Sequence, residues 1–468
     1  MDTRSKIVVD NIHGDIRLEA DEWRIVDTAS FQRLRSLKQL GMGHLTYPNA
    51  THSRFAHSLG VFRVMCRIVE APGLELKKEQ KADLRLAALL HDIGHYPYSH
   101  LMERVDNVTL TDEALQVKQQ ELIEIEAVEK GYPDHEALGR LILNRSDLVT
   151  AIGSKERSQK VAQLFSRAEA ADQQLSKLIH SSLDMDRMDY LMRDARAAGV
   201  PYGEIDLNYL LNNIRISPKG LVGVEQKALA AAEHFLMARM FMYRVVYYHK
   251  TTFAFEEACR QLLKRLKNEG KYDMPSSGNE IERIVESDQF ANFNDSFVDR
   301  RIREAATDAD QVIRALASSI VSRQAPKLVA EVSGLENPKE PCNQAAMFRR
   351  ECKLLIPELA KKYDLPLGQF LVCGPKPVKF EERSSHFDIS EARKLKPEER
   401  EELIMVFCKG DTEPRSIVEV PNGLASYCAE KVYGIQRLYI VDQGKDANGR
   451  LKAIKAEVAK WDSSKQQK

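Results

Sequence analysis

The architecture can be inferred from one segment, Leu84-Arg-Leu-Ala-Ala-Leu-Leu-His-Asp-Ile-Gly-His-Tyr-Pro-Tyr-Ser-His100. Its first half is apolar except for Arg85, which is typical of a helix buried in a core. The apolar run ends at His91 and Asp92, and Gly94 interrupts the pattern before His95. Burying an adjacent His and Asp is costly unless a partner satisfies both, and a divalent cation can do so. The segment therefore predicts a helical core that carries a metal-binding group.

The flanking segments also have helical periodicity. In the run 31–40, apolar residues recur at three-residue steps, and Gly41 follows as a stop signal. Further helices are predicted at 54–71, 113–130, 135–143, 158–194, 226–268, 297–322 and 342–363. Because long helices dominate and strands are few before residue 330, the predicted fold class of this part is mainly α.

The two ends of the chain show strand signals instead. Lys6 to Val9 is β-like and Asn11 to Gly14 is a turn signal, so a short N-terminal hairpin is predicted. Beyond residue 330, short apolar or β-branched runs occur at 369–373, 403–408, 416–420 and 437–441. We therefore expect residues 1–330 to form a helical core with the hairpin, and residues 331–468 to form a smaller α+β C-terminal region. Residues 270–279 and 383–397 are predicted loops.

Composition excludes several classes of protein. The 468 residues include 69 Lys and Arg against 69 Asp and Glu, which argues against nucleic acid as the main substrate, since that affinity rests on clustered basic residues. The chain has neither an apolar run of membrane-spanning length nor the apolar core of a signal peptide in its first residues, so a soluble cytoplasmic protein without a membrane partner is expected. The seven cysteines form no C-x-x-C pair, which predicts reduced thiols and a metal held by nitrogen and oxygen.

Histidine clustering is the first functional signal. Of the 12 histidines, those at 52, 57, 91, 95 and 100 lie within 49 consecutive positions. A His-Asp pair alone is weak support for a metal site, because such pairs also arise by chance on surfaces. The upstream His57 and the downstream Asp186 extend it to the order H…HD…D.

At these positions the sequence resembles the HD-domain phosphohydrolase superfamily. More narrowly, it is similar to the deoxynucleoside triphosphate triphosphohydrolases, which include bacterial dGTPase-like proteins and the vertebrate enzyme that pairs a SAM domain with an HD domain. The resemblance rests on Phe31-Gln-Arg-Leu-Arg35, Lys38-Gln-Leu-Gly41, His52-Ser-Arg-Phe-Ala-His-Ser-Leu-Gly60, His91-Asp-Ile-Gly-His95 with Ser99-His100, Asp184-Met-Asp-Arg-Met-Asp-Tyr190 and Tyr247-Tyr-His-Lys250. It continues more faintly to Phe407-Cys-Lys409 and Glu413-Pro-Arg-Ser-Ile417.

The resemblance implies one divalent metal ion per subunit, either Mn, Fe, Mg, Zn, Co or Ni. Its ligands would be His57, His91, Asp92 and Asp186, which leaves positions open for water and a phosphate oxygen. The alternative for His57 is a helix histidine that is simply hydrogen-bonded.

The resemblance also implies a catalytic group made of His95, His100, Glu103 and His135. A metal-polarised water would attack the α-phosphorus and release the whole tripolyphosphate. His100 would give a proton to the leaving 5′ oxygen, with Glu103 and His135 tuning it, and His95 would reach phosphate. Glu103 departs from the Asp of better-known relatives, and the alternative for His135 is a solvated helix start.

The remaining substrate contacts follow from the same resemblance. Three cations match phosphate-binding positions, and five residues match the sugar pocket. Tyr247 matches an aromatic residue packed on the 2′ carbon, which would exclude a 2′ hydroxyl and so favour deoxyribose. The cations are Arg54, Arg187 and Arg239, and the sugar-pocket residues are Gln39, Leu40, Tyr190, Asp194 and Tyr247.

Some relatives carry activating nucleotides at subunit contacts. One group of matching residues here is Asp27, Gln32 and Arg35, and a second is Arg215, Lys227, His249 and Lys250. Val9, Glu225 and Ala231 depart from the pattern, and Glu225 puts a negative charge where relatives carry a phosphate-binding Arg. Activation by a nucleotide in a homo-oligomer, expected to be a tetramer, is therefore an expectation of the resemblance.

Three functions remain open at the level of sequence. The preferred one is a metal-dependent hydrolase that converts dNTPs to deoxynucleoside and tripolyphosphate. The second keeps the metal site but acts on another nucleotide, which activity on GTP without dGTP cleavage would reveal. The third is a non-catalytic nucleotide-sensing protein, which release of inorganic tripolyphosphate would exclude.

Overall fold

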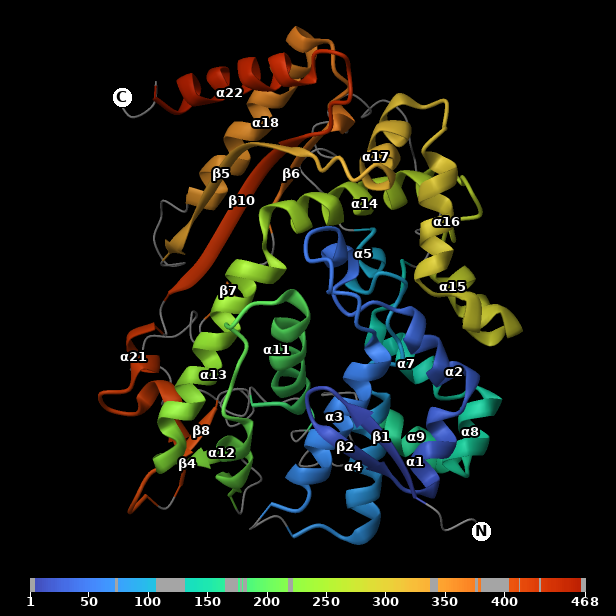
Figure 1. Ribbon diagram of the computed structural model, residues 1–468, viewed down its shortest axis with the longest axis vertical. Coiled ribbons are helices and arrows are strands. Elements are labelled where there is room, and N and C mark those ends of the chain that lie inside the picture. The colour runs from blue at the N-terminus through green and yellow to red at the C-terminus, as the bar shows by residue number, and fades with distance from the viewer. Residues whose placement is uncertain are drawn as a thin grey trace.

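The computed structural model describes residues 5–71, 75–106, 131–164, 176, 179, 183–217, 222–336, 344–374, 378–379, 404–411, 413–428 and 431–463. Over these residues helices dominate, and three small sheets lie at different places among them (Figure 1). The prediction of a mainly α fold is therefore confirmed. The helix predicted at 113–130 and the loop at 383–397 lie outside the described residues.

The centre of the helical core is made by α3 (Arg54–Ile68) and α4 (Lys78–Leu90), both close to their predicted positions. The C-terminal half of α4 is buried from Leu86 to Leu90, as its apolar sequence predicts. At the start of its polar N-terminal half, the Lys77 backbone N–H donates to Gln80 Oε1 at 2.9 Å. His91 is the C-cap of α4, so the buried helix ends by presenting the His-Asp pair to the interior.

The described residues form further α-helices. In chain order they are α1 (Ala20–Val26), α2 (Ala29–Gln32), α5 (His100–Glu103), α7 (His135–Ile142), α8 (Ser146–Ile152), α9 (Lys155–Gln163), α11 (Met185–Ala198), α12 (Leu207–Asn212), α13 (Leu229–Met242), α14 (Lys250–Asn268), α15 (Gly278–Glu286), α16 (Asp295–Ala305), α17 (Gln311–Val321), α18 (Gln344–Tyr363), α21 (Leu424–Cys428) and α22 (Ala447–Ser463). In Figure 1, α11 stands between α13 and the N-terminal part of the fold.

The continuous helix predicted at 31–40 is wrong. The structure has α2, a 3₁₀-helix at Arg33–Ser36 and a second one at Gly41–Leu45. An apolar step of three matches the 3₁₀ repeat of three residues per turn, and Phe31, Leu34 and Leu37 are fully buried in that form. Backbone bonds between 37–39 and 52–54 then replace a helical ladder, so the chain cannot continue as a helix.

Three long predicted helices are broken by side-chain caps. Within 158–194, Asp184 caps α11 by accepting a hydrogen bond from the Arg187 N–H, and within 297–322, Asp310 caps α17 in the same way. Within 226–268, a π-helical turn at Tyr243–Tyr247 ends α13, and His249 caps α14. A polar residue inside an apolar pattern therefore marks the start of a new helix in each case.

The N-terminal hairpin is confirmed. It pairs β1 (Lys6–Asp10) with β2 (Gly14–Leu18), antiparallel, with Lys6 opposite Leu18 and Asp10 opposite Gly14. Gly14 has a φ of 68°, a left-handed conformation that glycine adopts without a steric cost.

Two four-stranded sheets involve the C-terminal region. One contains β5 (Lys327–Glu336), β10 (Val432–Ile440), β6 (Phe370–Cys373) and β7 (Val378–Lys379). The other has the order β3 (Ile214–Ile216), β4 (Val222–Glu225), β8 (Met405–Phe407), β9 (Arg415–Ser416), with β8 parallel to β4. The predicted domain boundary at 330 lies within β5, and β8 extends a sheet of the first part.

Strand β10 is buried along its whole length because the sheet is covered on both faces. Leu438 and Ile440 pack in a small cluster with α18 and α22, whereas Tyr439 on the opposite face joins the main core. Figure 1 shows α18 and α22 outside this sheet and α14 beneath it. Strand β5 and α22 were not predicted, and residues 417–419 form a 3₁₀ turn where a strand was expected. No described helix has the length and apolarity needed to cross a membrane.

Candidate metal and nucleotide site

Three elements bring the predicted metal ligands together. His57 lies in α3, His91 and Asp92 follow α4, and Asp186 lies in the first turn of α11. The first turn of a helix favours a carboxylate, because unpaired backbone N–H groups there give a positive potential. The ligand atoms of His57, His91 and Asp92 lie within 4.8 Å of one another. Asp186 Oδ1 is 2.9 Å from His57 Nε2 and 3.8 Å from His91 Nε2.

Hydrogen bonds at the far side of each imidazole turn its Nε2 toward this cluster. His91 Nδ1 is 2.9 Å from the Ala88 carbonyl oxygen, which can only accept, so Nδ1 carries the proton and Nε2 keeps a lone pair. His91 Nε2 is buried and has no hydrogen-bond partner among the described residues. A buried, unpartnered imidazole nitrogen beside two carboxylates fits a divalent cation, and the N₂O₂ donor set suits a transition metal.

The electrostatics of the cluster point the same way. Burial would lower the pKa of His57, but hydrogen bonds to Asp186 and Asp189 raise it to about 10. Burial would raise the pKa of Asp92, and the neighbouring Arg54 instead holds it well below its ordinary value. The negative charge of the carboxylates in this cluster therefore exceeds the positive charge of the buried groups around them, unless a proton binds. A cation would take the place of that proton.

A second group lies beside the metal cluster and contains the predicted catalytic residues. Glu103 accepts hydrogen bonds from His100 Nδ1 at 2.6 Å and from His135 Nδ1 at 2.9 Å. His95 stacks on His135 at 4.5 Å between ring centroids, and its Nε2 lies 3.1 Å from Asp92 Oδ1. All four predicted residues therefore lie together, and His95 links them to the metal cluster. The longer side chain of Glu103 reaches both imidazoles.

The charges in this group are set by Glu103. Burial alone would raise the pKa of Glu103, but its two histidine partners hold it well below the ordinary value. Burial alone would lower the pKa of His135, and the hydrogen bond to Glu103 raises it instead. Burial lowers the pKa of His100, and the contact with Glu103 opposes that effect. Glu103 thus favours the protonated form of both imidazoles, the form that a general acid uses.

A cavity of about 1030 Å³ opens beside both groups. Every predicted substrate contact lines it: Gln39, Leu40, Arg54, Arg187, Tyr190, Asp194, Arg239 and Tyr247. These residues come from five separate segments of the chain, and the fold brings them together in one cavity.

The three predicted cations differ in their partners. Arg54 donates from Nη1 to Asp92 at 2.5 Å and from Nε to Ser99 Oγ at 2.7 Å, and Arg187 lies 3.3 Å from Asp184. Arg239 is only 8% exposed, and its Nε has no hydrogen-bond partner among the described residues. A buried N–H group without an acceptor is costly, and an anion in the cavity would satisfy it.

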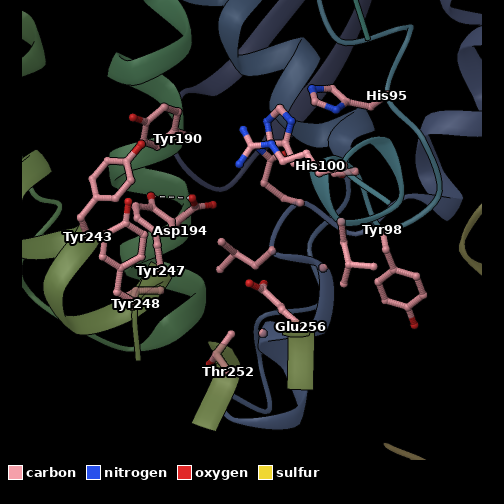
Figure 2. Close-up of a pocket in the computed structure, with 18 of the residues that line it drawn as sticks. His95, Tyr98, His100, Tyr190, Asp194, Tyr243, Tyr247, Tyr248, Thr252 and Glu256 are labelled. Atoms are coloured by element: carbon pink, nitrogen blue, oxygen red, sulfur yellow. Dashed lines mark hydrogen bonds between the residues drawn. The ribbon is translucent and has the colours of Figure 1, made fainter. Parts of the chain in front are cut away.

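Three of the five predicted sugar-pocket residues, Tyr190, Asp194 and Tyr247, lie together at one side of the cavity, on the left in Figure 2. Tyr247 donates its hydroxyl hydrogen to Asp194 at 2.8 Å, and His52 Nε2 lies 2.7 Å from the other carboxylate oxygen. The Tyr190 ring meets the Tyr247 ring edge-on at 6.1 Å. Each Asp194 oxygen keeps a second acceptor site, so the carboxylate can still receive a ligand hydroxyl.

A further part of the cavity lining was not predicted. Thr252 and Glu256 lie one turn apart on α14 and both line the cavity (Figure 2). The Thr252 hydroxyl is buried without a partner among the described residues, and burial raises the pKa of Glu256 to about 8. The four-residue spacing that places Thr252 and Glu256 on one face of α14 was the available signal. Tyr98 and Tyr243 also line the cavity and were not predicted.

The predicted regulatory residues lie away from the cavity lining. Asp27 pairs with Lys6, and Arg35 donates to Gln32 and lies over the Phe55 ring. In the second group, Lys227 pairs with Glu225, Arg215 lies over the Phe407 ring, and His249 and Lys250 begin α14. The described cysteines are all free thiols, as predicted.

Comparison with known proteins identifies the helical core. Residues 54–194 match the model of the HD domain, and residues 205–334 match the model of the HD associated region. The chain therefore contains an HD domain, and this domain includes all four predicted metal ligands.

Relatives differ in how much of the chain they match. An uncharacterised protein of Methanocaldococcus jannaschii is 34% identical over 249 residues, 53% of this chain and 46% of that protein. The deoxynucleoside triphosphate triphosphohydrolase SAMHD1 of Homo sapiens is 43% identical over 103 residues, 21% of this chain and 16% of that protein. The chain spans about half the length of the first curated relatives it matches.

A solved structure extends the likeness to nearly the whole fold. The crystal structure of a phosphohydrolase from Bacteroides thetaiotaomicron has a TM-score of 0.66 and 22% identity, and covers 93% of this chain and 100% of that one. The C-terminal region therefore belongs to a fold that other proteins share.

Proposed function

We propose that this HD-domain chain is a metal-dependent phosphohydrolase that converts dNTPs to deoxynucleoside and inorganic tripolyphosphate. One observation carries the proposal. The same cavity borders a cluster of metal-ligating side chains, the hydrogen-bonded group of His100, Glu103 and His135, and the buried side chain of Arg239, whose Nε has no hydrogen-bond partner among the described residues. A polyanionic phosphate ester is the ligand class that uses all three.

The chain's own residues supply most of the proposed mechanism. Arg239 and Arg54 bind the triphosphate, and His95 orients it against the Asp92 side of the cluster. A divalent ion, when bound, polarises a phosphoryl oxygen and lowers the pKa of the attacking water. Hydrolysis would form a bond from a water oxygen to the α-phosphorus and break the bond to the 5′ oxygen, with the proton of the water lost to solvent and a proton from solvent restoring His100 after it has donated. His100 donates the proton that the leaving 5′ oxygen needs, and Glu103 holds the proton in the group.

The direct test is an assay of each dNTP and NTP, singly and in pairs, with Mn²⁺ or Mg²⁺, and products resolved by chromatography. We expect stoichiometric deoxynucleoside and tripolyphosphate from dNTPs. Cleavage of NTPs alone would move the assignment to another nucleotide hydrolase. Binding of nucleotides without any cleavage would favour a sensing protein.

Replacing Tyr247 with Ala should reduce discrimination against ribonucleotides. If the ring packs on the 2′ carbon, its removal opens space for the 2′ hydroxyl, and a clash and an unpaired hydroxyl each cost about 1–3 kcal/mol. The ratio of kcat/KM for dNTP over NTP should therefore fall about tenfold or more. Tyr247→Phe is the matched variant, because it loses only the hydrogen bond to Asp194 and should keep the discrimination. An equal loss on both substrates in Tyr247→Ala would show that the ring is core packing.

We also propose that the chain works as a homo-oligomer, expected to be a tetramer, with activating nucleotides between subunits. The support is that the two groups of matching residues lie on different parts of the protein, outside the cavity, and each needs a neighbour to complete a site. Light scattering should give a tetramer, with nucleotide and metal increasing its population. A monomer under all of these conditions would contradict the proposal.

A further inference from the structure

We propose that the N-terminal hairpin supports the metal cluster from outside the HD domain, and that Asp189 and His13 are positioning residues that act through His57. The inference rests on the proposed metal site. It assigns a role to residues 6–18, which precede the segment matched by the HD domain model.

The contact nearest to the cluster is between His57 and Asp189. His57 is fully buried, and its Nδ1 lies 2.7 Å from Asp189 Oδ2, on the side of the ring that faces away from the ligand atom. A carboxylate at this position keeps the proton on Nδ1 and leaves the Nε2 lone pair for a metal. Asp189 therefore selects the tautomer that a ligand needs.

Asp189 is held by more than this imidazole. It is fully buried, and its Oδ1 accepts hydrogen bonds from His13 Nε2 at 2.7 Å and from Arg193 Nη2 at 2.9 Å. Its Oδ2 also accepts from Arg193 Nε at 2.7 Å. With His57, these donors use four acceptor sites, so the carboxylate has one fixed orientation.

The helices approach each other closely at this point. Gly60 lies one turn beyond His57 on α3, and a Cβ atom there would be 1.9 Å from Asp189 Oδ1 and 2.5 Å from Arg193 Nη2. Any side chain at residue 60 would displace the buried pair. The glycine therefore provides the space in which Asp189 reaches the back of His57.

The hairpin closes the network. Arg193 Nη1 donates to Asp10 Oδ2 at 2.9 Å, and Asp10 Oδ1 accepts from the backbone N–H groups of Ile12 and His13, both at 2.9 Å. The turn is thereby shaped to present His13, whose side chain is 6% exposed. Asn11 and Gly14 in the same turn are exposed, so burial in the turn is confined to the side chains that reach Asp189 and Arg193. The second strand anchors the hairpin in the core through Ile16 and Leu18, and this anchor holds the turn against the back of the site.

The test measures binding of Mn²⁺ alone to the metal-free full chain, by electron paramagnetic resonance of the free ion. We expect Asp189→Asn to weaken binding about 10- to 100-fold, the usual effect of an outer partner of a metal-bound histidine. His13→Ala should weaken it less, and His13→Gln, whose amide can donate to Asp189, should recover most of the affinity. His234→Ala, at an exposed histidine on α13, is the matched control and should bind like wild type.

Circular dichroism and the absorption bands of the Co²⁺-loaded protein separate positioning from folding. Folded variants with altered Co²⁺ bands and weaker Mn²⁺ binding support the proposal. Folded Asp189→Asn and His13→Ala with wild-type affinity and bands overturn it, as does a His13→Gln variant no better than His13→Ala. A wild-type chain that binds no Mn²⁺ would instead refute the proposed metal site.

Discussion

Asp186→Ala is expected to bind almost no divalent metal and to lose hydrolysis by about 10³-fold or more. Asp186 Oδ1 is the carboxylate oxygen nearest to His57 Nε2, at 2.9 Å. The residue lines the cavity, and 41% of its side chain is exposed. Removing it takes a negative charge from the first coordination shell without opening the core. The metal supplies several kcal/mol of transition-state stabilisation, and each 1.36 kcal/mol is a factor of ten in rate.

Elemental analysis and the chromatographic assay give the two readouts for this variant, and circular dichroism should show an unchanged helical signal. Asp92→Ala should have the same effect on metal, with a further loss because Arg54 loses its partner. Asp288→Ala, at an exposed aspartate of the segment 288–292, is the matched control. Full metal occupancy in Asp186→Ala would contradict the ligand assignment.

The sequence was sufficient for the centre of the fold because the signal there is local. The apolar run of α4, the His-Asp pair at its end and the glycine after it lie within ten residues, and their geometry follows from one helix terminus. The hairpin was predictable for the same reason, since its turn residues are adjacent in the chain. The resemblance then supplied His57 and Asp186, which no local pattern links to that pair.

Features set by distant packing could not be predicted. The sequence of residues 31–40 does not show that their backbone forms hydrogen bonds with residues 52–54. The strand β5 pairs with β10, which is distant in the chain, and no local pattern indicates this pairing. The hydrogen bonds behind His57 could not be predicted either, because His13 and Asp189 are 176 residues apart and meet only after α11 packs on α3. Thr252 and Glu256 were overlooked because α14 carries many polar residues, and a polar residue that faces a cavity looks the same in sequence as one that faces solvent.

In the proposed mechanism the metal cluster activates water, and the group of His100, Glu103 and His135 supplies the proton. Substitutions can separate these two roles. Asp92 contacts both groups, through His91 Nε2 at 3.2 Å and through His95 Nε2 at 3.1 Å. His100 and His135 contact only the second group, through Glu103. Loss of a residue in that second group should therefore leave the metal in place.

His100→Ala is accordingly expected to keep bound metal and substrate affinity while kcat falls about 10²-fold, the scale of a lost acid–base group. The imidazole exposes 47% of its side chain toward the cavity, so its loss should not disturb the core. Single-turnover kinetics with bound-metal analysis gives both readouts. An unchanged kcat would mean that the proton donor lies elsewhere.

Glu103→Gln distinguishes a proton donor from a residue that only binds phosphate. Glu103 raises the pKa of His135, and its contact with His100 opposes the burial that lowers the pKa of the His100 imidazole. A donor must be protonated, and kcat therefore falls as pH rises through the pKa of the group. Glutamine removes the negative charge, the pKa falls, and the alkaline limb of the kcat profile should move to lower pH while metal content stays constant. If His100 acted only as a phosphate ligand, the same substitution would change KM and leave the position of that limb unmoved.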